Sequence, residues 1–561
     1  MLRALSRLSF LALAAGAAGA AGAQGSGATA DLILTNGRIY TVDATRPVVD
    51  ALVVGRGMVM FAGNAAGAMA FKTATTRVVD LGGRTVIPGM VDAHGHVAGL
   101  GDALHIVDLT GTSSYDEVVA RVAERARKTP KGQWVLGRGW DQNDWGDTRF
   151  PTHDKMTAAV PDHPVYIVRV DGHAGLANLK ALQAAGVSAA TQDPSGGHIE
   201  RAADGSPAGV FVDNAQGLVR RAIPRQTRDE VKTSIVDAIK EAQRWGLTGA
   251  HDAGADATDL DVYEELARAG QMKFRLNAMI SDNTSTIDAW IKRGKLVDGY
   301  NGTLWVRSIK LYSDGALGSR GAALLEPYSD DPKNIGLLVS APAHIQEVAT
   351  KALKAGFQVN THAIGDRGNR LVLDAYEAAL KAVPTADHRF RVEHAQILNY
   401  DDIPRFAALG VIPSMQASHQ TSDMYWAGTR LGPVRLLGAY AWRSLLNTGV
   451  VIPNGSDFPV EQVNPLISFH SAVSRQDARD WPPDGWYASE RMTRDEALQS
   501  VTIWPAYAAF QEKVLGSLTP GKYADFVVLD QDIMRVPPEL LLRTKVLSTW
   551  VGGEKVYEAV P

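Results

Sequence analysis

The sequence predicts an α/β protein: a (β/α)8 barrel with a small β-sandwich domain formed by both chain ends and an insertion after the first barrel strand. Three observations support this prediction. The 561-residue chain is 45% hydrophobic, which allows a large core. Short strand-like runs gather near both ends. The middle alternates amphipathic helices with short apolar runs, a pattern that indicates a parallel sheet.

The first 23 residues have the pattern of a secretory signal peptide. Arg3 and Arg7 give a basic start, residues 8–15 are apolar, and residues 21–23 (AGA) form a small-residue cleavage pattern. We therefore expect cleavage and a periplasmic or secreted protein. The alternative is an uncleaved membrane anchor, but the apolar run is short for a membrane-spanning helix. Cleavage removes two arginines and no acid, so the formal charge of −4 becomes −6.

The composition excludes several kinds of site and partner. The chain has no cysteine, which excludes disulfides, thiolate metal ligands and a cysteine nucleophile. Any metal must be held by histidine, carboxylate or modified side chains. The small negative charge gives no reason to expect nucleic acid or an anionic membrane as partner. We expect a small-molecule substrate and no membrane association after signal cleavage, and we leave a homodimer open.

Strand-like runs at both ends predict one small β domain, built from residues 29–86 and 511–561. The dipeptide Asn36-Gly37 is typical of a β-hairpin turn, and it separates the first two runs. The runs are residues 31–34, 39–42, 51–54, 58–62, 524–529 and 545–550.

Residues 87–510 predict the barrel, of the TIM type. A capping-box sequence at residues 227–230 opens an amphipathic helix, Gly246 ends it, and an apolar strand follows. This pattern recurs and, with the strand that leads to His94, gives eight β units. Residues 97–244 are too long for one helix and contain strand-like runs of their own, so we interpret them as an insertion. The later barrel strands are expected at residues 247–251, 274–280, 306–311, 357–362, 390–394, 411–416 and 450–453.

Chemically active side chains gather at the expected carboxyl ends of these strands, where (β/α)8 barrels place their active sites. His94 and His96 are one residue apart, so extended backbone would direct both imidazoles to the same side. Neutral imidazole is a common metal ligand. His251 also ends a strand, and we interpret it as a structural histidine. The other strand-end candidates are Lys310, His362, His394 and Asp457.

Eight sequence motifs, taken together, are jointly specific although none suffices alone. They are residues 88–96 (PGMVDAHGH), 139–141 (GWD), 171–173 (DGH), Lys310 with Asp314-Gly315, 361–366 (THAIGD), 393–394 (EH), 455–457 (GSD) and 521–529 (GKYADFVVL). On these motifs, nearly the whole mature chain resembles the amidohydrolase superfamily of metal-dependent hydrolases. More narrowly, it resembles the branch that contains N-substituted formamide deformylase.

The resemblance implies a divalent metal cofactor, with zinc as the expected metal. It further implies that Lys310 is carboxylated on its amine by carbon dioxide and bridges two metals. Burial beside cations lowers the pKa of a lysine and favours that reaction. An unmodified Lys310 that faces a single metal is the alternative. The implied ligands are His94, His96 and Asp457 for one metal, His362 and His394 for the other, and Lys310 for both.

The implied reaction is hydrolysis of a non-peptide or small acyl C–N bond by a metal-bound hydroxide, with Asp457 carrying the proton to the leaving amine. An esterase, lactonase or dipeptidase would use the same site and is the alternative. A deaminase is disfavoured. Deaminases of this superfamily place a glutamate three residues after the histidine that ends the fifth strand, here His362, and this chain has Gly365 at that position. A non-catalytic scaffold is disfavoured because no ligand is missing.

The insertion and the loops that follow barrel strands supply the expected substrate contacts. We expect His173 to polarise or hydrogen-bond the substrate carbonyl as a second catalytic residue, and Arg320 to hold an anionic group. A packing or surface role is the alternative for each of these residues. Aromatic side chains in these segments predict an apolar or aromatic portion of the substrate. The remaining substrate-binding candidates are Trp140, Asp141 and His419.

Overall fold

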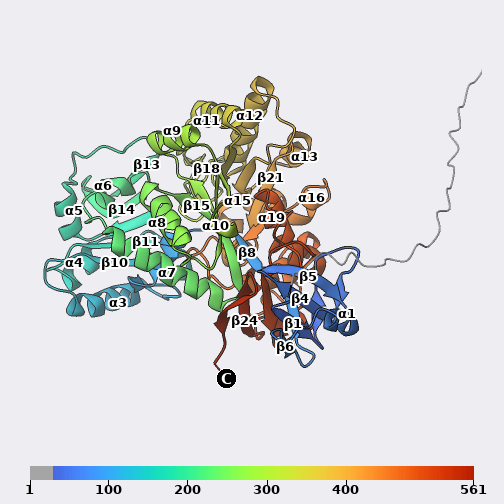
Figure 1. Cartoon of the computed structure of the whole chain (residues 1–561). Coiled ribbons are helices and arrows are strands. Elements are labelled where there is room, and N and C mark those ends of the chain that lie inside the picture. Colours follow the sequence, from blue (N-terminus) through green and yellow to red (C-terminus); the bar gives the residue numbers. More distant parts are fainter. Residues whose placement is uncertain (1–28, 561) are drawn as a thin grey trace, which may run out of the picture.

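A parallel sheet of eight strands forms the centre of the protein, whose computed structural model describes residues 29–560. The expected signal peptide lies outside these residues. The strand order is β22-β21-β20-β19-β18-β16-β15-β8, and helices surround the strands (Figure 1). This arrangement confirms the predicted barrel. The strands are β8 (Met90–Gly95), β15 (Leu247–Ala255), β16 (Arg275–Ile280), β18 (Leu304–Tyr312), β19 (Gln358–Ala363), β20 (Arg391–His394), β21 (Ile412–Gln416) and β22 (Asn454–Gly455).

Backbone hydrogen bonds join the first strand of the barrel to the segment that follows the last. The Asp457 N–H donates to the His94 carbonyl at 2.7 Å, and the His96 N–H donates to the Phe458 carbonyl at 2.8 Å. We call this contact between residues 92–96 and 456–458 the barrel seam. It closes the gap between β8 and β22.

The eighth strand is displaced from the prediction. Residues 450–453 were expected to form it, but only Asn454–Gly455 pairs with β21. Pro453 has no N–H to donate to a strand ladder, although its carbonyl accepts a hydrogen bond from the Met415 N–H of β21 at 3.1 Å. The Asp92 carboxylate supports the short strand by accepting hydrogen bonds from the Ser456 backbone at 3.0 Å and the Ser456 hydroxyl at 2.6 Å.

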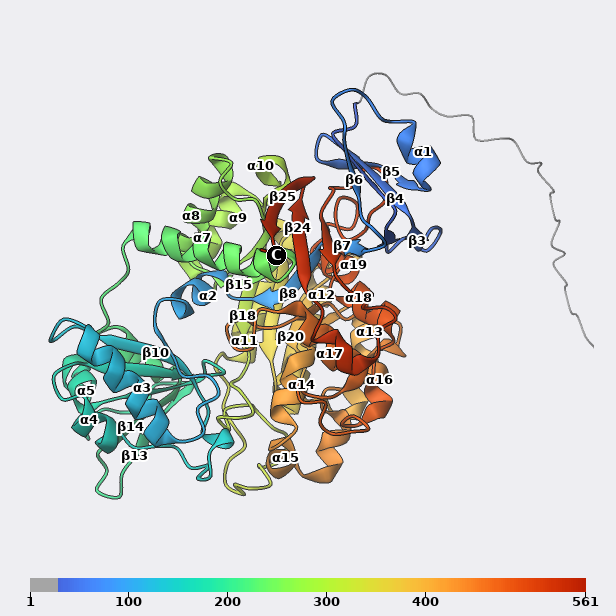
Figure 2. The same ribbon diagram turned by 90° about the horizontal axis from the view of Figure 1, so that it is seen from below.

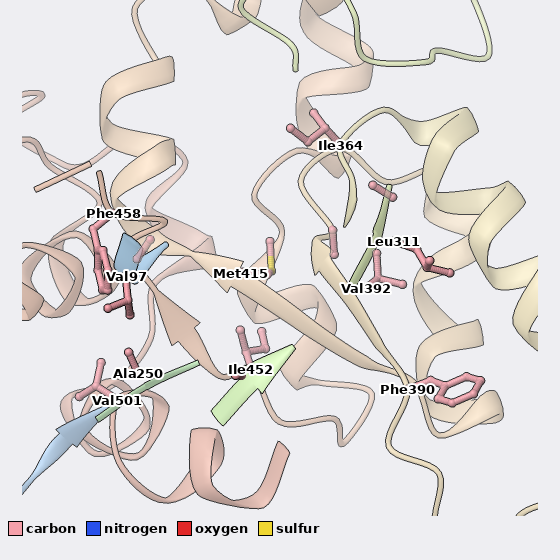
Figure 3. Close-up of a cluster of buried hydrophobic side chains, with 14 of the residues drawn as sticks. Val97, Ala250, Leu311, Ile364, Phe390, Val392, Met415, Ile452, Phe458 and Val501 are labelled. Atoms are coloured by element: carbon pink, nitrogen blue, oxygen red, sulfur yellow. The ribbon is translucent and has the colours of Figure 1, made fainter. Parts of the chain in front are cut away.

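Helices cover the outside of the barrel, and apolar side chains from strands and helices pack together in between, as for Leu311, Val392 and Met415 (Figure 3). Helix α7 has the predicted capping box at Thr227, and its apolar stripe packs into this same core, although it falls within the expected insertion. The longer helices are α7 (Arg228–Arg244), α8 (Ala257–Arg268), α9 (Thr284–Arg293), α11 (Pro342–Ala355), α12 (Asp366–Ala382) and α17 (Pro465–Ser474). Between residues 29 and 560, no helix combines the length and apolar character needed to cross a membrane.

The chain between β8 and α7 folds into a second sheet with an apolar core of its own. The strand order is β13-β14-β12-β11-β10-β9, and in both views this sheet lies to one side of the barrel (Figures 1 and 2). We call it the inserted sheet. Its strands are β9 (Val107–Asp108), β10 (Val135–Trp140), β11 (Val165–Arg169), β12 (Ala174–Ala177), β13 (Gly197–Arg201) and β14 (Pro207–Asp213), with helices α3 (Tyr115–Lys128), α4 (Asp154–Ala159), α5 (Leu179–Ala185) and α6 (Gln216–Arg220) around it. Helix α2 (Val97–Ala103) instead packs against α7 of the barrel.

Two further sheets contain the chain ends. One has the order β5-β4-β1-β6, and the other has the order β25-β24-β23-β7-β2-β3, so that β7 from the N-terminal part pairs antiparallel with β23 from the C-terminal part. Buried side chains of both sheets share one apolar cluster. The β-sandwich remains a prediction. The strands are β1 (Leu32–Thr35), β2 (Arg38–Tyr40), β3 (Val48–Val49), β4 (Ala51–Gly55), β5 (Met58–Gly63), β6 (Arg77–Asp80), β7 (Thr85–Pro88), β23 (Phe526–Leu529), β24 (Val546–Val551) and β25 (Glu554–Glu558).

The hairpin expected at Asn36-Gly37 is not formed. The turn itself is present, because Asn36 has a φ of 54°, which asparagine tolerates. However, β1 pairs with β4 and β6, whereas β2 pairs with β3 and β7. The turn therefore passes the chain from one sheet to the other.

A buried ion pair ties the barrel to the C-terminal sheet, and we expect it to contribute strongly to stability. The Arg275 guanidinium at the start of β16 donates to both oxygens of Asp525, at 2.8 and 2.9 Å. Asp525→Asn leaves a buried cation without its counter-charge, so we expect a loss of about 3–5 kcal/mol, read as a lower Tm by calorimetry. Glu554→Gln is the matched control, because the ion pair between Lys273 and Glu554 also joins the barrel to the sheet that contains β23 and β25, but at the exposed surface. Equal Tm changes in both variants would contradict this prediction.

Candidate metal centre

Three imidazoles and a carboxylate meet at the carboxyl end of the barrel. His94 and His96 both turn Nε2 toward Asp457, at 3.6 and 2.9 Å from its Oδ1 atom. Ligand atoms of His94, His394 and Asp457 lie within 4.8 Å of one another, and all three residues are buried. His394 and Asp457 have φ values of 73° and 60°, which are strained for side chains other than glycine. Such strain is typical of functional sites.

Lys310 and His362 complete the group of predicted ligands. The Lys310 Nζ lies 3.2 Å from the Nε2 atom of His94, and the His362 ring centroid lies 4.5 Å from that of His394. Both side chains are buried. The structure therefore brings together all six residues that the sequence suggested as metal ligands. They come from five different strand ends of the barrel.

Hydrogen bonds on the far side of two imidazoles fix their orientation. His94 Nδ1 contacts the Glu393 carboxylate, which also forms a 2.6 Å ion pair with Arg391. His394 Nδ1 lies 2.8 Å from the Gln416 Oε1 atom. Because each acceptor receives a hydrogen bond from the Nδ1–H group, the lone pair is on Nε2 and points into the centre, as a metal ligand requires.

Burial sets the protonation of the centre. It lowers the pKa of His94, His362 and His394 well below the usual value, so these imidazoles are neutral at pH 7. Burial likewise lowers the pKa of Lys310 to about 8. For Asp457, burial alone would raise the pKa, but the neighbouring imidazoles outweigh it and hold the pKa well below the usual range. Neutral imidazoles and an ionised carboxylate are the forms that bind metals.

The centre fits a divalent metal. The His362 Nε2 atom is buried and has no hydrogen-bond partner within residues 29–560. Such orphaned atoms are costly unless something else satisfies them. A donor set of imidazole nitrogens and carboxylate oxygens without sulfur suits zinc and other first-row divalent metals.

A cavity of about 630 Å³ opens onto this centre. The barrel contributes His362, His394 and Asp457 to its wall, and the inserted sheet contributes Asp141 and His173. Asp141 forms an ion pair with the buried Arg169 guanidinium. His419 also lines the cavity; its Nε2 atom lies 3.7 Å from Asp457 Oδ2 and has no hydrogen-bond partner in the described part of the chain.

Two expected substrate contacts lie elsewhere. Trp140 is fully buried in the core of the inserted sheet, where its indole N–H donates to the Ile167 carbonyl at 3.1 Å. Arg320 does not line the cavity either, because its guanidinium pairs with Asp330 at 2.9 Å. The substrate-binding role expected of both residues is therefore corrected to a structural one.

Several further residues border the centre or its cavity. Glu393 was seen only as part of a motif, yet its alternation with Arg391 on one strand gave a signal, since residues at i and i+2 share a face. Asp213, which contacts His173 at 2.6 Å, and Arg138, which lines the cavity, gave no such signal. Their importance depends on how the inserted sheet packs against the barrel.

Comparisons with known proteins agree with this geometry. The sequence profile of the amidohydrolase family matches residues 77–557. The chain belongs to the amidohydrolase family. This amidohydrolase is 35% identical to Protein LONG AFTER FAR-RED 3 of Arabidopsis thaliana, over 95% of this chain and 92% of that protein. It is 28% identical to the N-substituted formamide deformylase of Arthrobacter pascens, over 94% of this chain and 98% of that protein. The structure of an uncharacterized metal-dependent hydrolase from Pyrococcus horikoshii superposes with a TM-score of 0.73 and 27% sequence identity, over 90% of this chain and 99% of that one.

Removal of the carboxylate behind His94 is expected to weaken metal binding. Glu393→Gln keeps the shape of the side chain but loses the charge that holds the Nδ1 proton, so we expect metal affinity to fall about 10- to 100-fold. Affinity is measured by competition with a chelator, and bound metal by elemental analysis.

Glu264→Gln is the control, because it removes a largely buried carboxylate that pairs with Arg293 away from the centre. It should lower the Tm without changing metal affinity. Unchanged affinity in Glu393→Gln would contradict the orienting role of Glu393.

Proposed function

We propose that this amidohydrolase cleaves the C–N bond of a small, non-peptide amide. The observation that carries the proposal is the convergence of neutral imidazoles, Lys310 and Asp457 at the floor of one cavity. A cavity of about 630 Å³ suits a small molecule rather than a protein substrate. The likeness to an N-substituted formamide deformylase over nearly the whole chain supports an amide as the substrate.

Asp457 and His173 are the residues that move or hold protons in this reaction. Asp457 accepts a proton from the attacking water as the new C–O bond forms, and it returns that proton to the amine nitrogen as the C–N bond breaks. His173 hydrogen-bonds the carbonyl oxygen, on which negative charge develops. The products are a carboxylic acid and an amine, so one water is consumed for each bond cleaved.

Zinc is the metal that we propose for the centre, with two ions per chain if Lys310 is carboxylated. His94, His96 and Asp457 would hold one ion, and His362 and His394 the other. Bound metal supplies Lewis acidity toward the carbonyl and lowers the pKa of water from 15.7 to about 7. The lowered pKa of Lys310 leaves a share of its amine uncharged near neutral pH, which carboxylation requires.

The setting of the reaction is also a proposal. The pattern of residues 1–23 supports a periplasmic or secreted protein, and the cavity supports a small-molecule partner. The small β domain from both chain ends would be a β-sandwich, given that its two sheets share an apolar cluster.

Metal-loaded protein is expected to hydrolyse amides in preference to esters of the same acyl group. We suggest a screen of N-formyl and N-acyl amines against matched aryl esters, lactones and dipeptides. Chelation should abolish turnover, and zinc should restore it. His94→Ala should lower kcat by at least about a hundredfold, because the loss of a ligand removes the metal chemistry.

His344→Ala is the control for these measurements, since this histidine pairs with Asp282 outside the cavity. It should retain full activity. Faster turnover of esters or lactones than of amides would replace the amide proposal with an esterase or lactonase. Activity without bound metal would contradict both the amidase and the esterase proposals.

Carboxylation of Lys310 predicts a specific change in metal content. In Lys310→Met, the metal stoichiometry should fall from two to one or less and activity should be lost, because the bridging carboxylate is gone. Short carboxylic acids such as formate or propionate should restore part of the activity by taking its place. A stoichiometry of one in the native protein, unchanged by added bicarbonate, would instead support an unmodified lysine beside a single metal.

A further inference from the structure

The imidazole of His173 reaches the metal centre from the inserted sheet rather than from the barrel. It follows β11 in the chain and lines the cavity, and its ring centroid lies 5.2 Å from that of His362. Its Nδ1 atom lies 2.6 Å from the Asp213 Oδ1 atom. Since the two ring nitrogens are on opposite sides of an imidazole, the contact through Nδ1 turns Nε2 away from Asp213.

Asp213 is itself held in place by its contacts with His173. Its side chain is only 2% exposed and ends strand β14, where the backbone takes a φ of 48°. Its backbone N–H donates to the His173 carbonyl at 2.8 Å, so main chain and side chain of the two residues are both joined. This double contact fixes the position of the imidazole relative to the strand.

The loop after the lysine strand closes over the Asp213 carboxylate. A Cβ atom at Gly315 would lie 2.5 Å from Asp213 Oδ2, and one at Gly321 would lie 2.6 Å from it. A side chain at either position would have to displace the Asp213 carboxylate, so the close approach of the loop favours glycine at both. The loop thereby links Asp213 to β18, the strand that carries Lys310.

We propose that Asp213 is a positioning residue, which holds the His173 imidazole with Nε2 directed at the substrate carbonyl beside the metal centre. The inserted sheet then contributes to the reaction itself and does not only cover the barrel. A carboxylate behind an imidazole fixes both its tautomer and its orientation. This inference rests on the proposed function, because it assigns to Asp213 an effect that is exerted through His173.

The inserted sheet contains a second His–Asp pair that serves as an internal comparison. His198 Nδ1 lies 2.8 Å from Asp193 Oδ2, but this pair is exposed and does not line the cavity. Asp193→Ala therefore removes a similar contact from the same sheet without touching the centre, and it should leave activity unchanged.

A double-mutant cycle tests the proposal on zinc-loaded full-length protein, with formanilide, an N-aryl formamide, as the probe. His173→Ala should lower kcat on the order of 10²- to 10³-fold. Asp213→Ala should lower kcat about 10- to 100-fold with little change in KM. Asp213→Asn should have a smaller effect on kcat than Asp213→Ala, because its amide oxygen still accepts a hydrogen bond from the Nδ1–H group. In the His173→Ala background, Asp213→Ala should have no further effect on kcat.

Three readouts that do not need turnover accompany the cycle. Zinc content and Tm show whether a variant is intact, and crystal structures of the Asp213 variants show the direction of the His173 ring. We expect the ring to leave the cavity in Asp213→Ala and to stay in Asp213→Asn. An unmoved ring in Asp213→Ala, or a further loss of kcat in the His173→Ala background, would overturn the inference while leaving the proposed function intact. Full activity of His173→Ala would instead remove the proposed role of His173, and the role of Asp213 with it.

Discussion

The barrel seam is the constraint on which the centre depends. The hydrogen bonds that close the barrel are made by the backbones of His94, His96 and Asp457, whose side chains form the candidate metal site. Closure of the barrel and assembly of the site are therefore one event. The Asp92 carboxylate supports both, because it accepts from the His94 N–H and from Ser456 on the opposite side of the seam. Burial raises the pKa of Asp92 to about 7, although the hydrogen bonds from Ser456 and His94 act in the opposite direction.

A second constraint is that the centre holds charge inside an apolar barrel. Arg391 is fully buried, and its guanidinium pairs with Glu393 on the same strand, donates to the Ala93 carbonyl on β8 and contacts His251 on β15. A buried cation is tolerated only when it is paired and hydrogen-bonded. The same network holds Glu393 against His94, so one set of contacts both neutralises the interior and orients a ligand. His251 takes part as an acceptor, which fits a structural role.

The inserted sheet gives this barrel much of its cavity wall. Its apolar core is separate from that of the barrel, so it can be built without disturbing the strands that carry the ligands. Contact with the centre is concentrated in a few polar side chains, among them Arg138 and His173. The Arg138 guanidinium donates to the Val170 carbonyl at 2.6 Å within the inserted sheet, which fixes the wall at that point. Loops and insertions at this end of a barrel are where substrate preference is set.

The sequence by itself predicted the barrel from local patterns, and it placed the candidate metal ligands at strand ends. Apolar runs between amphipathic helices locate strands, and a chemically active residue after a parallel strand has only one end of the barrel to occupy. Tertiary structure alone decided which other side chains matter. Trp140 is of a residue type that often contacts substrates, but it packs into the core of the inserted sheet. Arg320 forms an ion pair with Asp330, which lies ten residues away in the same loop. Asp213 has no local signal, because its partner and the glycine loop around it come from segments far apart in the chain. Burial and pairing are properties of the folded chain, and a sequence pattern does not contain them.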